Sequence, residues 1–348
     1  MSVFEEIATF LSQKIPFVCY VKPNKNNWNL LSQNNDELIH FSGQEGFVFM
    51  PFDEGIPVVI PFEGNSFSQG AFENCVKIKI PTFPKPENNQ KDDFENLVSK
   101  GIFAIQNGEF EKVVLSRKIV LNEQISIVET FQNLIVSYPL ALRYLFFHPK
   151  VGLWMGATPE QLVKINQTVF ETVALAGTQL YAQNINWATK EIEEQQFVTD
   201  YIVSNLENKV ENLLISDAKT IKAGNLAHLK SIISGTLSAD FYAIDLIRTL
   251  HPTPAVCGLP KEKAIDFILK NEGYNRKYYA GFLGEYNKDN QTDLFVNLRC
   301  LEVENDVVNI YVGCGITKES NPEKEFIETE NKSMTMRNVL VSKTFLNS

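Results

Sequence analysis

The order of strand-like and helix-like segments is the feature of this 348-residue sequence that most limits its fold. Residues 17–80 alternate short apolar runs with Pro, Gly and Asn, a pattern typical of strands separated by turns. Three further strand-like runs follow one another in residues 278–316. Amphipathic patterns predict helices over residues 94–107, 127–137, 190–214 and 322–340. Because strands and helices do not alternate regularly, the order predicts an α+β fold and argues against a doubly wound sheet.

The organisation of the chain follows from the same pattern. We expect one catalytic body over residues 1–348, with a strand-rich N-terminal part at 1–90 and a motif-bearing part at 94–340. The stretch 81–93 is rich in Pro, Asn and charge and is predicted to be a linker or a long surface loop. With 44% hydrophobic and 21% charged residues the chain can bury a large core, which argues against disorder of the whole chain.

Charge and cysteine usage restrict the partners and the compartment. The net charge is -10 and no run of Lys and Arg interrupts it, so nucleic acid is not expected as a partner. The five cysteines are scattered and form no C-x-x-C pair, which indicates a reducing compartment. Glu5 and Glu6 stand where a signal peptide has basic residues, and the apolar stretches are too short to span a bilayer. We therefore expect a cytoplasmic protein that does not associate with membranes.

Two predicted helices each carry a pair of carboxylates. Glu191 and Glu194 are three residues apart, as are Glu325 and Glu328, so each pair shares one helix face. Carboxylates presented in this way suit a hard cation that retains waters, such as Mg²⁺. Acidic residues are also common in first helical turns, and Glu328 with Lys332 is an ordinary surface pair. Spacing alone favours this second interpretation.

Isolated polar side chains inside apolar segments are further candidates for a site. Arg299 lies in the apolar run VNLRCL, where a guanidinium suggests bidentate carboxylate binding. Lys112 opens KVVLSR and is either a desolvated base or a strand-edge lysine, and strand-edge lysines are the commoner. Glu160 follows Pro159 and either acts as an acid or caps a turn, while His251 is expected to be scaffold.

Glycines mark three of the predicted strands, at residues 174–178, 279–284 and 313–315. Glycine in a strand indicates either a close approach of the backbone to a ligand or a bulge. None of the three has the spacing of a nucleotide-binding loop.

Nine short motifs, taken in order, resemble the motif series of the chorismate-utilising enzymes. The motifs are KVVLSR, GATPEQL, ALAGT, KEIEEQ, LHPTPAVCGLP, YYAGFLG, NLRC, GCGI and SNPEKEFIETENK. The family includes isochorismate synthase, salicylate synthase, anthranilate synthase component I and aminodeoxychorismate synthase. The resemblance covers roughly residues 94–340.

This resemblance implies a fold and a site. The implied fold is an α+β body with two large stacked antiparallel sheets and helices outside, like that of anthranilate synthase component I. The implied cofactor is Mg²⁺, held by Glu194 and Glu328 with support from Glu191 and Glu325. The implied substrate-binding residues are Gly177, Thr178, Tyr279, Arg299, Gly313 and Lys332. In the branch of the family that adds water, a lysine base and a glutamate acid match Lys112 and Glu160.

Three places indicate the branch. Anthranilate synthases carry glutamine in place of Lys112, aminodeoxychorismate synthases carry a lysine in place of Ala176, and salicylate synthases usually lack LHPTPAV, which is intact here. The resemblance therefore implies an isomerase of the isochorismate synthase type. Such an enzyme converts chorismate to isochorismate with Mg²⁺, by attack of water at C2 and loss of the C4 hydroxyl, for menaquinone or siderophore biosynthesis, and needs no amidotransferase subunit. A salicylate synthase with pyruvate-lyase activity and a non-catalytic chorismate-binding relative are the alternatives.

The sequence also departs from the family pattern at three positions. Gln195 replaces the usual histidine after the metal glutamate, Lys277 replaces a glycine after Arg276, and Cys314 stands between two glycines. None of these changes removes a group to which the resemblance assigns a catalytic role.

Overall fold

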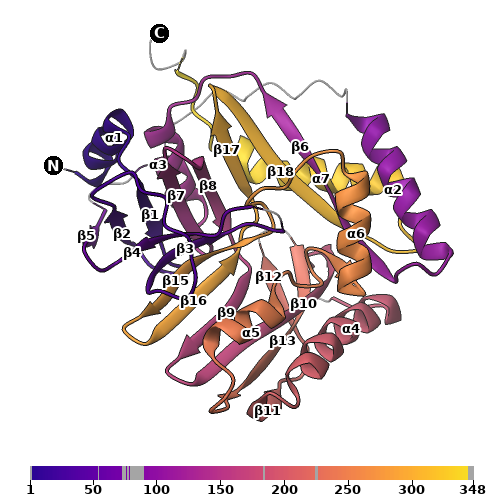
Figure 1. Ribbon diagram of the computed structural model, residues 1–348. Coiled ribbons are helices and arrows are strands. Elements are labelled where there is room, and N and C mark those ends of the chain that lie inside the picture. Colours follow the sequence, from indigo (N-terminus) through magenta and orange to yellow (C-terminus); the bar gives the residue numbers. More distant parts are fainter. Residues whose placement is uncertain are drawn as a thin grey trace.

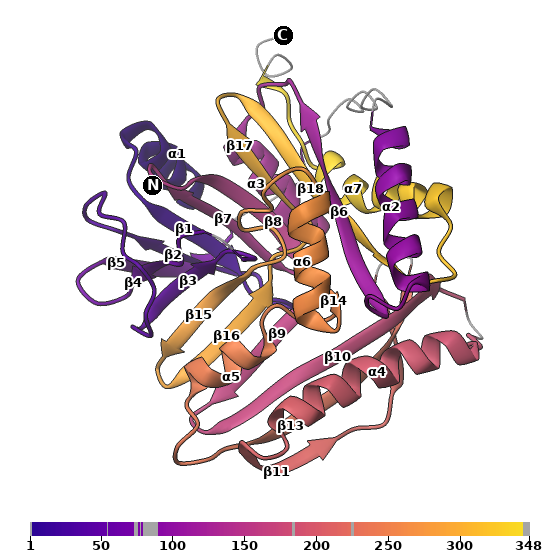
Figure 2. The same cartoon turned by 45° about the vertical axis from the view of Figure 1, so that its right-hand side comes forward.

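The structure, a computed structural model, describes residues 2–53, 55–72, 76, 78, 90–182, 185–223 and 226–343. Over these residues the chain forms two large antiparallel sheets stacked at the centre, with helices on the outside (Figures 1 and 2). The α+β fold with stacked antiparallel sheets that the motif resemblance implied is therefore confirmed.

The first sheet joins the N-terminal strands to the motif-bearing strands. Its order is β14 (Gly258–Leu259), β6 (Lys112–Leu121), β18 (Val307–Ile316), β17 (Cys300–Glu304), β8 (Gly152–Thr158), β7 (Leu142–His148), β1 (Phe17–Val21), β2 (Asn27–Ser32) and β5 (Ser66–Ala71). The long β6–β18 pair places Gly313 opposite Ser116 and Ile316 opposite Val113. This register brings the glycine-rich end of β18 beside the start of β6.

The second sheet is built in the same way. Its order is β11 (Val210–Ile215), β13 (Leu226–Leu237), β10 (Val169–Leu180), β9 (Gln161–Asn166), β16 (Gln291–Val296), β15 (Phe282–Lys288), β3 (Gly46–Met50) and β4 (Val58–Pro61), with β12 (Lys219–Ala223) also paired to β13. The N-terminal strands thus pair with the motif-bearing part in both sheets, through β1 with β7 and β3 with β15.

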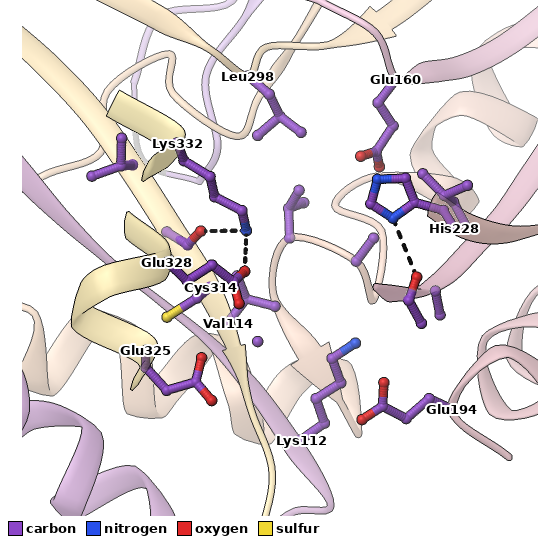
Figure 3. A pocket seen from close by; sticks show the side chains of 18 of the residues that line it. Lys112, Val114, Glu160, Glu194, His228, Leu298, Cys314, Glu325, Glu328 and Lys332 are labelled. Carbon is purple, nitrogen blue, oxygen red and sulfur yellow. Dashed lines mark hydrogen bonds and ion pairs between the residues drawn. The ribbon is translucent and has the colours of Figure 1, made fainter. Parts of the chain in front are cut away.

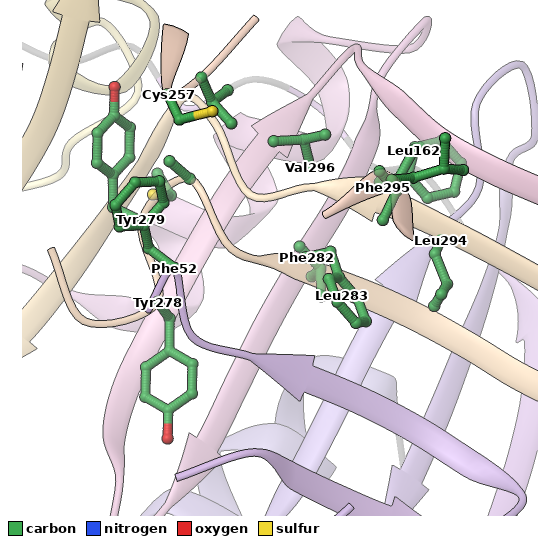
Figure 4. Packing of buried hydrophobic residues seen from close by; sticks show 14 of the residues in the cluster. Phe52, Leu162, Cys257, Tyr278, Tyr279, Phe282, Leu283, Leu294, Phe295 and Val296 are labelled. Atoms are coloured by element: carbon green, nitrogen blue, oxygen red, sulfur yellow. The ribbon is translucent and has the colours of Figure 1, made fainter. Parts of the chain in front are cut away.

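Side-chain alternation along the strands produces two cores. In β7, Tyr144 and Phe146 pack in the core between the sheets, whereas Leu145 packs on the outer face of the first sheet. Successive strand residues point to opposite faces, so one buried strand serves both clusters. Figure 4 shows part of the inter-sheet core around Phe282 and Phe295. Burial of these aromatic side chains supplies much of the driving force that holds the sheets together.

Helices cover the sheets and frame one end of the stack. They are α1 (Val3–Gln13), α2 (Lys91–Gln106), α3 (Ile127–Ser137), α4 (Thr189–Leu206), α5 (Ala243–Leu250), α6 (Lys261–Asn271) and α7 (Pro322–Arg337). Helix α4 packs on β10 and β13 of the second sheet, and α7 packs on β18 of the first sheet and on α2. No helix in the part of the chain described here is long and apolar enough to cross a membrane.

Several predicted elements are confirmed, but the helix predicted over residues 190–214 is wrong at its C-terminal end. Helix α4 ends at Leu206, and residues 210–215 form β11 on the edge of β13. Val210 and Leu213 pack against the inter-sheet core from this strand, so the apolar spacing that suggested a helix serves an edge strand instead. The helix at 127–137 agrees with α3, and those at 94–107 and 322–340 correspond to α2 and α7. Most of the predicted linker, residues 81–89, lies outside the described residues.

Candidate active site

A cavity of about 360 Å³ is lined by side chains of α4 on one side and of α7 on the other (Figure 3). Its walls come from β6 and β18 of the first sheet, β10 and β13 of the second sheet, and both helices. The volume is within the range of small-molecule sites.

Eleven of the twelve predicted site residues line this cavity. They are Lys112, Glu160, Gly177, Glu191, Glu194, Tyr279, Arg299, Gly313, Glu325, Glu328 and Lys332. The side chain of the twelfth, Thr178, lies outside what the structure describes. Residues spread over more than two hundred positions of the chain therefore meet in one place, and the roles assigned to them stay predictions.

Lys112 and Glu160 lie on facing sides of the cavity (Figure 3). Burial lowers the pKa of Lys112, and the nearby Glu194 carboxylate offsets this only in part. Burial raises the pKa of Glu160 to about 7, against the opposing effect of Lys332, Arg299 and Lys112. The two shifts favour a neutral amine and a neutral carboxylic acid, the forms needed to accept and to donate a proton near neutral pH.

Arg299 presents a guanidinium to the cavity from the turn between β16 and β17. Its φ of 50° lies in the left-handed region that residues other than glycine rarely adopt. In the described part of the chain its side chain has no hydrogen bond or ion pair, although burial lowers its pKa. An unpaired guanidinium at a cavity wall suits a bound carboxylate.

Lys332 and Tyr279 add further polar groups to the cavity wall. Lys332 Nζ lies 2.6 Å from Glu328 Oε1 and donates to the Gly313 carbonyl at 2.9 Å. A Cβ at Gly313 would lie 2.9 Å from the hydroxyl oxygen of Tyr279, so glycine permits this close approach.

The four predicted metal carboxylates lie on two opposite walls. Glu191 and Glu194 belong to α4, and Glu325 and Glu328 belong to α7. Glu191 Oε2 is buried and has no hydrogen-bond partner, and burial together with the Glu328 charge raises the pKa of Glu325. Such oxygens suit a hard cation. Among the described residues, however, no three His, Cys, Asp or Glu side chains are close enough to form a ready metal site.

Sequence reasoning missed several lining residues, of which His228 is the most polar. It lies on β13, a strand that was not predicted, and its Nδ1 is 3.2 Å from the Gly177 carbonyl oxygen. Burial lowers the pKa of His228. The signal was weak because the histidine stands in LAHLK, whose alternation of apolar and polar residues is short. Leu298, Val256 and Cys314 also line the cavity.

Two of the remaining polar positions have structural explanations. Gln195 is buried, and its Nε2 donates to Thr199 Oγ1 at 2.9 Å and to Ser231 Oγ at 2.8 Å, which ties α4 to β13. His251 packs edge-on against Phe282 and does not line the cavity, as expected for scaffold.

Comparison with known proteins identifies the family. Residues 65–341 match the family described as chorismate binding enzyme. Isochorismate synthase DhbC of Bacillus subtilis is 31% identical over 280 residues, which cover 74% of this chain and 68% of DhbC. Isochorismate synthase MenF of Escherichia coli is 30% identical over 263 residues, covering 72% of this chain and 60% of MenF. The chain therefore belongs to the chorismate-binding enzymes, and the resemblance drawn from its motifs is confirmed.

Solved structures support the fold. The structure of a putative 2,3-dihydroxybenzoate-specific isochorismate synthase, DhbC from Bacillus anthracis, superposes with a TM-score of 0.78 at 22% identity, covering 97% of this chain and 99% of that chain. MenF, the menaquinone-specific isochorismate synthase from Escherichia coli, gives 0.81 at 19% identity, covering 94% and 89%.

Proposed function

We propose that this chain is an isochorismate synthase, an isomerase that converts chorismate to isochorismate. The observation that carries the proposal is the pair Lys112 and Glu160, which face each other across one cavity with pKa values shifted in opposite directions. Relatives named isochorismate synthase, such as DhbC of Bacillus subtilis, support the proposal.

Substrate binding is assigned to the cationic and hydroxyl groups of the wall. Chorismate carries two carboxylates, and the protein has a net charge of -10, so the local field must be reversed where the substrate binds. Arg299 has no competing ion pair among the described residues and would bind one carboxylate in bidentate fashion, beside the Tyr279 hydroxyl. Lys332 adds a second cation.

Proton transfer is assigned to the facing pair. The neutral amine of Lys112 takes a proton from a water as its oxygen bonds to C2 of the ring. The ring double bonds shift, the C4–O bond breaks, and protonated Glu160 gives its proton to the departing hydroxyl, which leaves as water. One water enters and one leaves, so the step is an isomerisation and runs in both directions.

The cofactor we propose is Mg²⁺, with Glu194 and Glu328 as direct ligands and Glu191 and Glu325 supporting them. Once bound, the ion would neutralise the ring carboxylate and withdraw electrons from the diene. The partnerless buried oxygen of Glu191 on α4, and the burial and Glu328 charge that raise the pKa of Glu325 on α7, support a cation between the two helices.

The choice of water as nucleophile follows from two side chains. Ala176 lines the cavity and offers no nucleophile, and Lys112 supplies a base that ammonia does not require. We therefore propose that no amidotransferase partner is needed. We also propose a cytoplasmic location, supported by the four cysteines that the structure describes, all of them buried and unpaired. Menaquinone and a siderophore are the two destinations that the resemblance implies for the product.

Incubation of the purified protein with chorismate and Mg²⁺, followed by chromatography, tests the proposal. Isochorismate should form until it reaches equilibrium with chorismate, and added ammonia should give no amino product. Salicylate as the main product would instead assign the chain to the pyruvate-lyase branch. Binding of chorismate without turnover would assign it to the non-catalytic relatives.

A further inference from the structure

Lys277 combines an unfavourable backbone conformation with an ion pair to a buried carboxylate. It follows Arg276 at a φ of 51°, in the left-handed region where glycine is the favoured residue. Its Nζ lies 2.7 Å from Glu302 Oε1 and 3.2 Å from Glu304 Oε2. The side chain of Glu302 is only 3% exposed, whereas that of Glu304 is 55% exposed. The two partners of one lysine therefore lie in very different environments.

Glu302 connects this lysine to the cavity wall. It lies on β17, and its second oxygen, Oε2, accepts a hydrogen bond from the Tyr311 hydroxyl at 2.8 Å. A buried carboxylate needs both a counter-charge and hydrogen-bond donors, and Lys277 and Tyr311 supply them on separate oxygens. Removal of the lysine would leave the Glu302 charge without its cation.

Tyr311 transmits the constraint to a predicted substrate-binding residue. Its ring lines the cavity and lies between two other rings, stacked on Trp154 at 5.3 Å and on Tyr279 at 5.5 Å, with interplanar angles of 18° and 17°. The Tyr279 hydroxyl lies close to Gly313, since a Cβ on that glycine would come within 2.9 Å of it. A shift of the Tyr311 ring would therefore move the hydroxyl that meets the substrate.

We propose that Lys277 and Glu302 are positioning residues for substrate binding. They hold the Tyr311 hydroxyl, the stacked rings transmit this to Tyr279, and Tyr279 meets a chorismate carboxylate. The proposal rests on the proposed function, since it specifies how one wall of that site is held in place. Neither residue touches the cavity, so each acts only through Tyr311.

Three near-isosteric variants of the full chain test the link: Glu302→Gln, Tyr311→Phe and Lys277→Met. Glu304→Gln is the matched control, because it removes the exposed partner of the same lysine and leaves the Glu302–Tyr311 bond intact. A lost hydrogen bond to a charged group corresponds to about a tenfold change in affinity. We expect KM for chorismate to rise about tenfold in the three variants, with kcat changed less than about twofold. The lost interaction would weaken binding of the substrate and of the transition state equally. The control should keep the parental KM.

The double variant Glu302→Gln with Tyr311→Phe separates positioning from general destabilisation. Both changes break the same link, so its KM should equal that of either single variant. If KM is unchanged in the single variants, even where thermal stability falls, the cluster is only a structural ion pair and the proposal is overturned. A rise in KM of the same size in Glu304→Gln would also overturn it. If the parent binds chorismate without converting it, the proposed function fails. The same comparison made on Kd by calorimetry then still decides the positioning role.

Discussion

At the scale of single residues, burial of the Glu160 carboxyl favours the protonated form that the proposed mechanism needs, but it lowers the stability of the folded chain at neutral pH. Its pKa, raised to about 7 in the folded chain, keeps the acid protonated near neutral pH. When folding raises the pKa of a carboxyl, the protein has its full stability below the pKa of the unfolded chain, 4.5. That stability is lost as pH rises from this value through the folded pKa of about 7. Glu160→Gln should therefore gain thermal stability over the parent by an increment that grows from pH 5 to pH 8. Differential scanning fluorimetry across that range measures it, and a constant increment would contradict the shift.

The second prediction concerns Lys112, because it decides whether the site can activate water. Glutamine can still hydrogen-bond a water but cannot accept its proton, so Lys112→Gln should lose about 10²–10⁴-fold in kcat. KM for chorismate should change little, since Arg299 and Tyr279 remain. Lys118→Gln is the control, because Lys118 lies on the same strand, β6, and does not line the cavity. If Lys112→Gln kept most of the parental turnover, Lys112 would be a strand-edge lysine and the mechanism would fail.

The pH dependence of kcat/KM gives a third prediction. Activity requires Lys112 unprotonated and Glu160 protonated, so the profile should be bell-shaped, with one limb at an apparent pKa of about 7 set by Glu160. The residual activity of Glu160→Gln should lack that limb and keep the other. A profile with the same two limbs in both proteins would show that Glu160 is not the acid.

Sequence reasoning at this scale identified residue types but not their conformations. Arg299 was predicted inside a strand, whereas it lies in a turn between two strands, with a φ of 50°. No glycine at this position indicated such a turn in the sequence. For Lys112 the sequence left base and strand-edge interpretations open. The structure pairs its backbone with Leu259 of β14 and directs its side chain into the cavity.

At the scale of elements, helices α4 and α7 face each other across the cavity with one carboxylate pair each. If they hold Mg²⁺, a chelator should abolish turnover and added Mg²⁺ should restore it. Glu194→Gln and Glu328→Gln should nearly eliminate Mg²⁺ binding in calorimetry, while Glu191→Gln and Glu325→Gln should weaken it about 10–100-fold, as outer carboxylates commonly do. Glu193→Gln, on α4 but outside the cavity, is the control. Full turnover in chelator would leave these glutamates as helix-end charges.

The same two helices show where periodicity was sufficient and where it was not. Helix α7 begins at Pro322 as predicted, because Asn321 caps it by accepting from the Lys324 N–H. The predicted continuation of α4 to residue 214 failed because Val210 and Leu213 fit an apolar helix face and an edge strand equally well. Pairing with the edge of β13 makes this segment a strand. Such pairing partners are distant in sequence and leave no local signal.

At the scale of the whole molecule, the two sheets must keep a fixed relation, because the site takes its walls from both. The motif order predicted that Lys112 and Lys332 share a site, but only the stacking brings them to one cavity. Periodicity gives the faces of strands and not the sheet to which each belongs, so the division into two sheets came from the resemblance and not from the pattern.

One polar cluster links the sheets away from the site and gives the last prediction. Glu285 on β15 of the second sheet accepts a hydrogen bond from the Tyr20 hydroxyl on β1 of the first sheet, and its Oε2 lies 2.5 Å from Lys22 Nζ. Burial alone would raise the pKa of Glu285, but the Lys22 charge and the hydrogen bonds from Lys22 and Tyr20 outweigh burial and lower it. A depressed pKa contributes stability above the unfolded value of 4.5, and this is lost as pH falls through the folded value.

Glu285→Gln should therefore lower the free energy of unfolding by about 1–3 kcal/mol at pH 7, the cost of a buried polar group that loses its partner. The deficit should shrink as pH falls from 4.5 through the folded pKa of Glu285, because over that range the parent loses the stability that its charge contributes. Urea unfolding of both proteins at pH 7 and pH 4 measures it, with Asp289→Asn, a nearby exposed acid, as the control. KM for chorismate should stay at the parental value, because Glu285 does not line the cavity. A deficit of equal size at both pH values would mean that the packing of the side chain, and not its charge, joins the sheets at this end of the molecule.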